Sequence, residues 1–176
     1  MATAERQQEG QHRDSSDFVI TQTFDAPREL VFQSWVEPER LAQWWGPVGF
    51  ELSVLALDLQ PGGVFHYGMR ADNGYEMWGK FTYQAIEAPE RIVSILSFAD
   101  KQGNAVQHPV SATWPLESFN TMTLTEENGK TTMTLRSTPH KASDEQHETF
   151  KQGFESMKEG FKATFAQLAQ YLARVQ

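Results

Sequence analysis

The sequence contains no cysteine among its 176 residues. This absence excludes disulfide bonds, thiolate catalysis and every metal site that uses cysteine ligands. The histidines do not replace it, because no two of them have metal-ligand spacing on one predicted element and there is no HExxH motif. A GxSxG nucleophile motif and a GxxxxGKS or GxxxxGKT phosphate loop are also missing. The sequence therefore predicts no metal and no cofactor, and it favours a protein without catalytic residues.

Basic clusters and long apolar runs are absent as well. The formal net charge is −8, and no group of lysines and arginines forms a local basic patch. This balance argues against nucleic-acid binding and against binding to anionic membranes. No apolar run approaches the roughly 18 residues of a membrane span, and residues 1–17 lack the apolar segment of a secretory signal. We expect a cytoplasmic monomer or homodimer, with a disordered leader at 1–17 and one domain at 18–176.

Aromatic residues, in contrast, make up 12% of the sequence, including twelve Phe and five Trp. Apolar residues, four of them Phe, recur at steps of three and four near the C-terminus, at Phe150, Phe154, Met157, Phe161, Phe165, Leu168 and Leu172. This spacing places them on one face of a helix. Ser143 and Gln146 have the spacing of a capping box at its start. The segment predicts one long helix that covers a broad apolar surface.

The preceding segments alternate as strands do. The segment FVITQTF, which starts at Phe18, predicts a strand; Asp25 is then placed to cap a helix whose first turn contains Pro27. Glu37-Pro38 divides this region into two short helices, and Gly46-Pro47 ends the second. About six strands follow in hairpin order. Residues 99–118 show no regular pattern and predict a loop that acts as a lid or rim.

Two hairpin turns determine which side chains face inward. The turn at 72–74 sets Phe65, Tyr67 and Met69 on one face with Met77, Gly79, Phe81 and Tyr83. The Asn128-Gly129 turn aligns Met122 and Leu124 with Leu135 and Met133. Alternation of apolar and polar residues on these strands predicts an antiparallel sheet with one buried face. With the long helix laid across that face, the fold class is α+β.

Several motifs resemble those of a known family. They are FDAPRELVFQSWVEPERLAQWWGP at 24–47, DLQPGG at 58–63, WPLE at 114–117, TEENGKTTMTLR at 125–136 and FKQGFESMKEGFKATFAQLAQYL at 150–172. With these motifs the chain resembles the START-like (SRPBCC) superfamily, and within it the bacterial single-domain homologues of the activator of the heat-shock protein 90 ATPase. It departs from that family at Gln60, where arginine is more common, and at Phe161, where tryptophan is more common. The resemblance implies a helix-grip fold, in which a curved antiparallel sheet of about six to seven strands wraps around the long C-terminal helix.

The inward-facing side chains would either line a ligand cavity between sheet and helix or fill a core. Trp44 and Trp45 differ by about 100° on a helix, so one is expected to pack inward while the other reaches the surface or a cavity. Ser94 and Asn120 are expected to orient the polar end of a ligand. The predicted lining residues are Trp35, Trp44, Phe65, Tyr67, Met69, Phe81, Tyr83, Ser94, Asn120, Met122, Met133, Met157, Gly160 and Phe161. Of the two helix glycines, we expect close packing at Gly153 and open space at Gly160.

Three functions remain open from the sequence. The first is a non-catalytic domain that encloses a small apolar or amphipathic molecule. The second, implied by the resemblance, is an interaction module that stimulates a heat-shock chaperone ATPase; the eukaryotic activators carry a further N-terminal domain where this chain has a polar leader. The third is a cyclase- or dehydratase-like enzyme acting on an enclosed polyketide-like substrate, with Tyr67 or Tyr83 as the acid–base group.

Overall fold

The computed structural model describes residues 17–176, so the predicted leader, apart from Asp17, lies outside the described residues. The chain begins with β1 (Phe18–Phe24), followed by the short helices α2 (Arg28–Val36) and α3 (Pro38–Trp44). The elements that follow are β2 (Phe50–Leu57), β3 (Val64–Ala71), β4 (Glu76–Glu87), β5 (Arg91–Ala99), β6 (Ala105–Val106), β7 (Ser118–Glu127), β8 (Lys130–Pro139), α4 (Asp144–Gln152) and α5 (Phe154–Val175).

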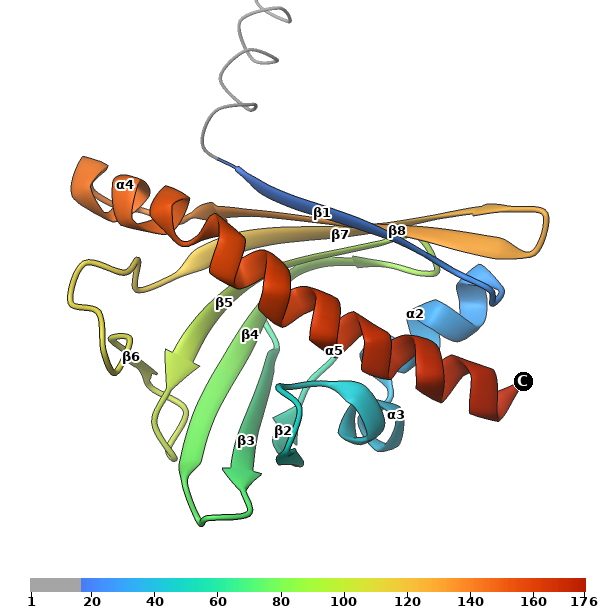
Figure 1. Ribbon diagram of the computed structural model, residues 1–176, viewed down its shortest axis with the longest axis horizontal. Helices are drawn as coiled ribbons and strands as arrows, with labels where there is room; N and C mark the ends of the chain where they lie inside the picture. Colours follow the sequence, from blue (N-terminus) through green and yellow to red (C-terminus); the bar gives the residue numbers. More distant parts are fainter. Residues whose placement is uncertain (1–16) are drawn as a thin grey trace, which may run out of the picture.

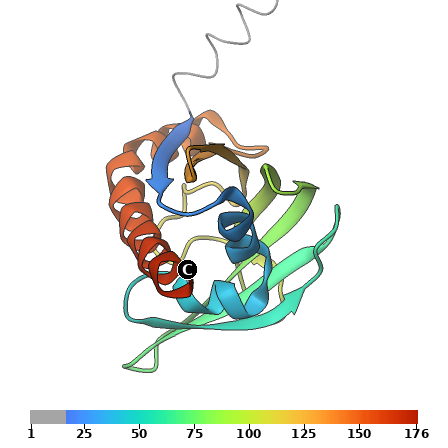
Figure 2. The same cartoon turned by 90° about the vertical axis from the view of Figure 1, so that its right-hand side faces the viewer.

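The strands form one antiparallel sheet with the order β1-β8-β7-β5-β4-β3-β2, and β6 pairs with the end of β5. The sheet is curved but not closed, because β1 and β2 are its two edges. Helix α5 runs across the hollow side of this sheet (Figure 1). Helices α2 and α3 lie at one end, between α5 and the strands (Figure 2). This arrangement confirms the predicted helix-grip fold.

Both predicted hairpin registers are confirmed. Met122 pairs with Leu135 across the β7–β8 hairpin, and Asn128 and Gly129 have the positive φ values of 55° and 77° that a two-residue hairpin turn requires. In the β3–β4 hairpin, Tyr67 pairs with Gly79. A Cβ atom on Gly79 would collide with the hydroxyl oxygen of Tyr67, so glycine at this position leaves room for the ring.

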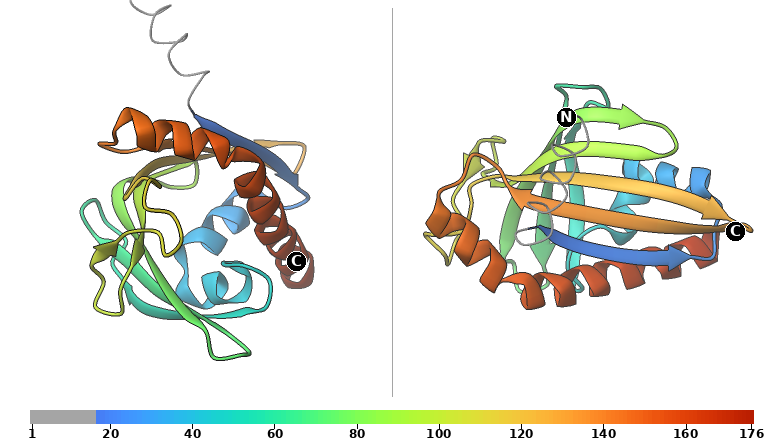
Figure 3. Two further views of the ribbon diagram at one scale, coloured as in Figure 1. Left: turned by 60° about the vertical axis from the view of Figure 1, so that its left-hand side comes forward. Right: turned by 90° about the horizontal axis from the view of Figure 1, so that it is seen from above.

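The prediction of one long C-terminal helix is wrong, because the helix breaks at Gly153. The Gly153 amide still donates to the carbonyls of Thr149 and Phe150, and its own carbonyl accepts from Met157. Its ψ of 0° nevertheless turns the chain between α4 and α5, so that the two helices follow different directions along the sheet (Figure 3). The predicted capping box at the start of α4 is confirmed, with both Ser143–Gln146 hydrogen bonds present.

The predicted helix cap at Asp25 is also wrong. Helix α2 starts one position after Pro27, whose carbonyl oxygen accepts hydrogen bonds from the amides of Leu30 and Val31. The chain bends at Asp25 and Ala26 before it, and the Thr131 hydroxyl donates to the Ala26 carbonyl at 2.7 Å. This contact keeps Asp25 two residues away from the helix, where its side chain cannot reach the first-turn amides.

The apolar stripe of the C-terminal helices is unevenly buried. At its two ends the stripe is almost fully buried, by Phe150 on α4 and by Phe165, Leu168 and Leu172 on α5. The middle residues Phe154, Met157 and Phe161 are only partly buried. The sheet therefore does not close completely against the middle of the stripe, and two cavities lie there.

Candidate functional site

Two adjacent cavities lie between the sheet and α5. The larger has a volume of about 210 Å³ and is bounded by strands of the sheet, by α5 and by the loop before β7. The smaller, of about 30 Å³, lies toward α2 and α3. They share Leu96, Asn120 and Phe161 in their linings. An apolar cavity of about 150 Å³ binds benzene, so by proportion this space suits a molecule of roughly eight to ten non-hydrogen atoms.

The linings are apolar and uncharged. Among the residues that the structure describes, no Asp, Glu, Lys, Arg or His lines either cavity. Aromatic rings provide much of the wall, for example Phe81 and Phe161, which approach from opposite sides. Burying an ion in such an environment without a partner would cost far more than burying a neutral group. The lining therefore disfavours a charged group in either cavity.

The structure brings ten of the fourteen residues predicted to line a ligand site to the walls of these cavities. Trp35, Phe81, Tyr83, Ser94 and Met122 line the smaller cavity. Tyr67, Met69 and Met157 line the larger, and Asn120 and Phe161 contribute to both. The inward register of the two hairpins brings the residues of β3, β4 and β7 together, since each of these belongs to the buried face that the turns specify. The others come from the helices α2 and α5 and, for Ser94, from β5.

Four predicted positions lie elsewhere. Phe65 and Met133 are buried in the core beside the cavities. Gly160 is exposed; a side chain there would meet nothing within 4 Å, so the open space predicted at this residue is solvent. Trp44 is also a core residue, packed against the Trp35 ring with centroids 4.9 Å apart.

Trp45 takes the cavity position that was predicted for Trp44. Helix α3 ends at Trp44, and Trp45 has an extended backbone with ψ of 137°. Its ring packs edge-on against Phe81 with centroids 5.3 Å apart and lines the smaller cavity. The offset of 100° between neighbouring helical residues does not apply to Trp45, because this residue lies outside the helix. The sequence-based prediction therefore assigned the cavity position to the wrong tryptophan.

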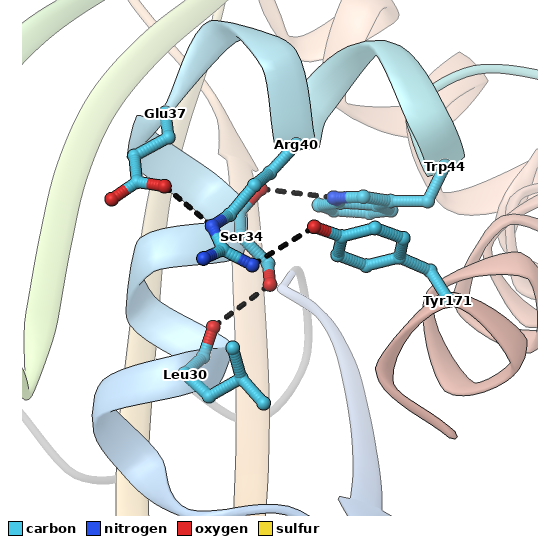
Figure 4. Close-up of polar contacts among 6 residues, drawn as sticks. All are labelled: Leu30, Ser34, Glu37, Arg40, Trp44 and Tyr171. Carbon is cyan, nitrogen blue, oxygen red and sulfur yellow. Dashed lines mark hydrogen bonds and ion pairs between the residues drawn. The ribbon is translucent and has the colours of Figure 1, made fainter. Parts of the chain in front are cut away.

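A hydrogen-bond network fixes the helices that carry these tryptophans (Figure 4). The Trp44 indole donates to the Ser34 carbonyl at 2.9 Å, joining α3 to α2. Arg40 pairs with Glu37 on the same short helix turn, and its Nη1 donates to the Tyr171 hydroxyl at 2.9 Å. Because Tyr171 lies on α5, the network ties α3 to the helix that covers the cavity.

Polar groups are few but central. Tyr83, Ser94, Asn120 and Ser137 are all buried on the inward face of the sheet. The Nδ2 of Asn120 donates to the carbonyl and hydroxyl oxygens of Ser118, both at 3.2 Å. Its Oδ1 accepts no hydrogen bond from any described residue. The cavity thus presents hydroxyl groups and one amide oxygen to an occupant.

Both buried tyrosines remain protonated at neutral pH. Burial raises the pKa of Tyr67 to about 12, with the nearby Trp45 indole partly opposing the rise. Within residues 17–176 this indole nitrogen makes no hydrogen bond of good geometry. Its effect on the pKa of Tyr67 is therefore smaller than that of burial. Burial also raises the pKa of Tyr83, and by more. A general base needs a pKa near the working pH, so neither hydroxyl is suited to abstract a proton, although both can donate a hydrogen bond.

The loop before β7 forms a wall that sequence reasoning did not assign to the site. Trp114, Pro115 and Leu116 line the larger cavity. The Trp114 ring packs against Phe150 with centroids 5.3 Å apart, and the Thr149 hydroxyl hydrogen-bonds that of Thr113 at 2.9 Å. The prediction that this loop is a rim thus agrees with its position. No periodic pattern in a loop can identify which of its residues reach the cavity.

Across residues 17–176, no three acidic or histidine side chains cluster closely enough to hold a metal ion. None of the helices in the same range is both long and apolar enough to cross a membrane.

The fold and its internal cavity define a protein of the START-like superfamily. More narrowly, residues 25–173 match the family described as Activator of Hsp90 ATPase homolog 1-like protein. Because the match covers most of the sequence, the chain belongs to this family. None of the curated proteins compared with the chain matches it.

Solved structures of bacterial proteins share this architecture. A crystal structure of a Mycobacterium smegmatis protein is 27% identical, with a TM-score of 0.75 over 93% of this chain and 95% of that chain. The solution structure of an Arthrobacter aurescens protein is 28% identical, with a TM-score of 0.76 over 92% and 88% of the two chains. A Staphylococcus epidermidis protein is 25% identical, with a TM-score of 0.71 over 92% of each chain.

Proposed function

We propose that the protein is a non-catalytic binding domain that encloses a small, uncharged apolar or amphipathic molecule between the sheet and α5. The observation that carries the proposal is the uncharged cavity of about 210 Å³ beneath the half-buried middle of the helix stripe. Ligand sites in proteins are typically apolar hollows with a few well-placed polar groups, and Asn120 and Ser94 are such groups here.

The packing supports a cavity that serves a ligand over one left by imperfect packing. Protein interiors normally leave few voids larger than a water molecule, and a large empty space destabilises the fold in proportion to its volume. Here the rings around the space contact rings on several other elements, as the Trp45 ring does with those of Trp35 and Phe81. A bound molecule would restore the contacts that these walls lack.

Native mass spectrometry of protein purified from its own host tests the proposal. We expect a bound small molecule that leaves on collisional activation. Met157→Trp should abolish its retention, because Met157 lines the larger cavity and a bulkier ring there fills the space. Lys158→Trp is the matched control: Lys158 is the exposed next residue, and this variant should keep the ligand. The proposal would be contradicted if the same ligand mass were bound to wild type and to Met157→Trp, or if neither protein carried a bound ligand.

A second candidate is supported by the family's description, which refers to activation of the Hsp90 ATPase. Apolar side chains on the loop before β7 are exposed, with Val110 88% and Leu116 42% accessible. Such residues provide contacts for a partner protein. If this is the function, the purified protein should raise the ATPase rate of the host's Hsp90 homologue, and Val110→Ser should reduce the increase. An unchanged ATPase rate at saturating protein would rule this candidate out.

A further inference from the structure

A row of polar side chains crosses the floor of the cavity from strand to strand. Tyr83 on β4 pairs with Ser94 on β5, Ser94 pairs with Asn120 on β7, and Asn120 pairs with Ser137 on β8. Directly paired residues of an antiparallel sheet point to the same side. The four residues, here called the polar row, therefore form one line perpendicular to the strands on the inward face.

The polar row is buried and lies between apolar rows. The exposed fractions of Tyr83, Ser94, Asn120 and Ser137 are 1%, 6%, 7% and 3%. The neighbouring row on one side contains the Phe81–Leu96 pair, and that on the other contains Ile92, Met122 and Leu135. A line of polar groups in this position weakens the core unless each group finds a hydrogen-bond partner.

The protein itself supplies few of these partners. Within residues 17–176, the hydrogen bonds that the side chains of the polar row make are those from the Asn120 Nδ2 to Ser118. The hydroxyls of Tyr83, Ser94 and Ser137 and the Oδ1 of Asn120 remain available. None of them is sealed from the cavity, whereas the buried oxygen of Ser97 and the indole nitrogens of Trp35 and Trp45 are sealed. The free groups can thus bond to an occupant of the cavity.

The geometry of the polar row indicates what this occupant is. Neighbouring strands lie about 5 Å apart, a spacing close to that of two oxygens on opposite ends of a six-membered ring. Asn120 contributes to both cavities, with Ser94 and Tyr83 on the smaller and Ser137 on the larger. Because its free Oδ1 only accepts, its partner must be a donor such as a hydroxyl group.

We propose that the polar row recognises an uncharged, compact cyclic molecule that carries oxygens at opposite ends of its ring, at least one of them a hydroxyl, and that lies across the strands. This inference rests on the proposed ligand-binding function and names the class of ligand. The lack of a charged lining residue means that an anionic relative, such as a carboxylate, would be excluded.

Two probes of equal size test the inference: p-xylene and hydroquinone, the latter kept under argon to prevent oxidation. Binding is followed by chemical-shift titration of the protein's methyl and indole signals. In Asn120→Leu, which preserves the side-chain shape, hydroquinone should bind about fivefold to tenfold more weakly, because a buried hydrogen bond is lost. The affinity for p-xylene should stay the same or increase, since that probe has no group to pair with Oδ1.

A second variant guards against a folding defect in the first. Ser137→Ala removes the hydroxyl of the residue that pairs with Asn120 on β8. It should lower the affinity for hydroquinone about threefold or more, again without loss of p-xylene binding. The control is Thr121→Val, adjacent to Asn120 but on the opposite face of β7, where it pairs with Arg136 and Val93. It should leave the binding of both probes unchanged.

The outcomes separate this inference from the proposed function. If both variants leave the affinity for hydroquinone unchanged, or lower the affinity for p-xylene by the same factor, the polar row does not recognise the ligand, although the cavity still binds one. If wild type binds neither probe, the inference and the proposed function both fail.

Discussion

The ring of Trp114 occupies the space that a side chain on Gly153 would need. A Cβ atom built on Gly153 would lie 2.8 Å from the Cζ3 of Trp114, closer than real side-chain carbons approach one another. The expected close packing at this glycine is therefore present. The contact joins the loop before β7 to the point where α4 and α5 meet, and it closes one end of the larger cavity.

Gly153→Ala should destabilise the protein because the added methyl group displaces Trp114. We expect a loss of about 1–3 kcal/mol in the free energy of unfolding, typical of overpacking, measured by urea denaturation. Combined with Trp114→Leu, the alanine should cost less than it does alone, since the two positions share one space. Equal costs in both backgrounds would show that the contact does not constrain residue 153.

Gly160→Ala should have the opposite effect. A Cβ there meets nothing within 4 Å, and alanine is favoured over glycine inside a helix by about 1 kcal/mol. The same denaturation experiment should show a gain of about 0.5–1 kcal/mol. A loss at Gly160 would mean that its surroundings are not open.

The inward face of β8 can be tested with a single charge. Met133→Asp should unfold the domain or cost several kcal/mol, because Met133 is 1% exposed and an unpaired buried carboxylate has no compensating partner. Thr134→Asp, one residue further on the outer face, should change stability by less than about 1 kcal/mol. Circular dichroism melts of the pair would expose an error in the register if their effects were exchanged.

Stability should fall in alkaline solution because of the buried tyrosines. The pKa of Tyr67 rises from 10.0 to about 12 on folding, so between those pH values the unfolded chain holds fewer protons than the folded one. The free energy of unfolding must then decrease as pH rises through this window and is unaffected by this group below it. The contribution lost is about 2–3 kcal/mol.

Removing the hydroxyl isolates this effect. Denaturation curves recorded from pH 9 to 12 should fall less steeply for Tyr67→Phe than for wild type. Tyr75→Phe, which changes an exposed ring, should follow the wild-type pH dependence. Parallel curves for wild type and Tyr67→Phe would indicate that the Tyr67 hydroxyl ionises as easily in the folded protein as in the unfolded chain.

The Arg40–Tyr171 hydrogen bond should contribute measurably to the docking of α3 on α5. Tyr171→Phe removes it without changing the ring and should cost about 1 kcal/mol. In a double-mutant cycle with Arg40→Met, the two effects should be less than additive by a similar amount. Additive losses would show that the 2.9 Å contact carries no energy of its own.

The inward face of the sheet was predictable because short-range rules determine it. A two-residue turn at Asn128-Gly129 permits one register, and once Met133 and Leu135 are known to face inward, alternation places Ser137 beside Asn120. Counting two residues further along β8 would therefore have added Ser137 to the predicted site.

The remaining features depend on contacts that no local pattern encodes. The helix breaks at Gly153, where the ring of Trp114, a residue far away in the sequence, packs against it. The spacing of apolar residues continues through this position and gives no sign of the break. The choice between Trp44 and Trp45 depends on α3 ending between them. Helix ends are the feature that sequence patterns predict least well, and here one residue decides which ring reaches the cavity.

The position of β1 at the edge of the sheet has a consequence for how the chain folds. Its partner is β8, so that Thr21 and Thr134, side by side in the sheet, are 113 residues apart in sequence. During synthesis β1 leaves the ribosome long before the strand it pairs with. Contacts of such long range slow folding. β1 can therefore join the sheet only after β8 has been synthesised, and a nascent chain halted before β8 would carry β1 with no neighbour to pair with.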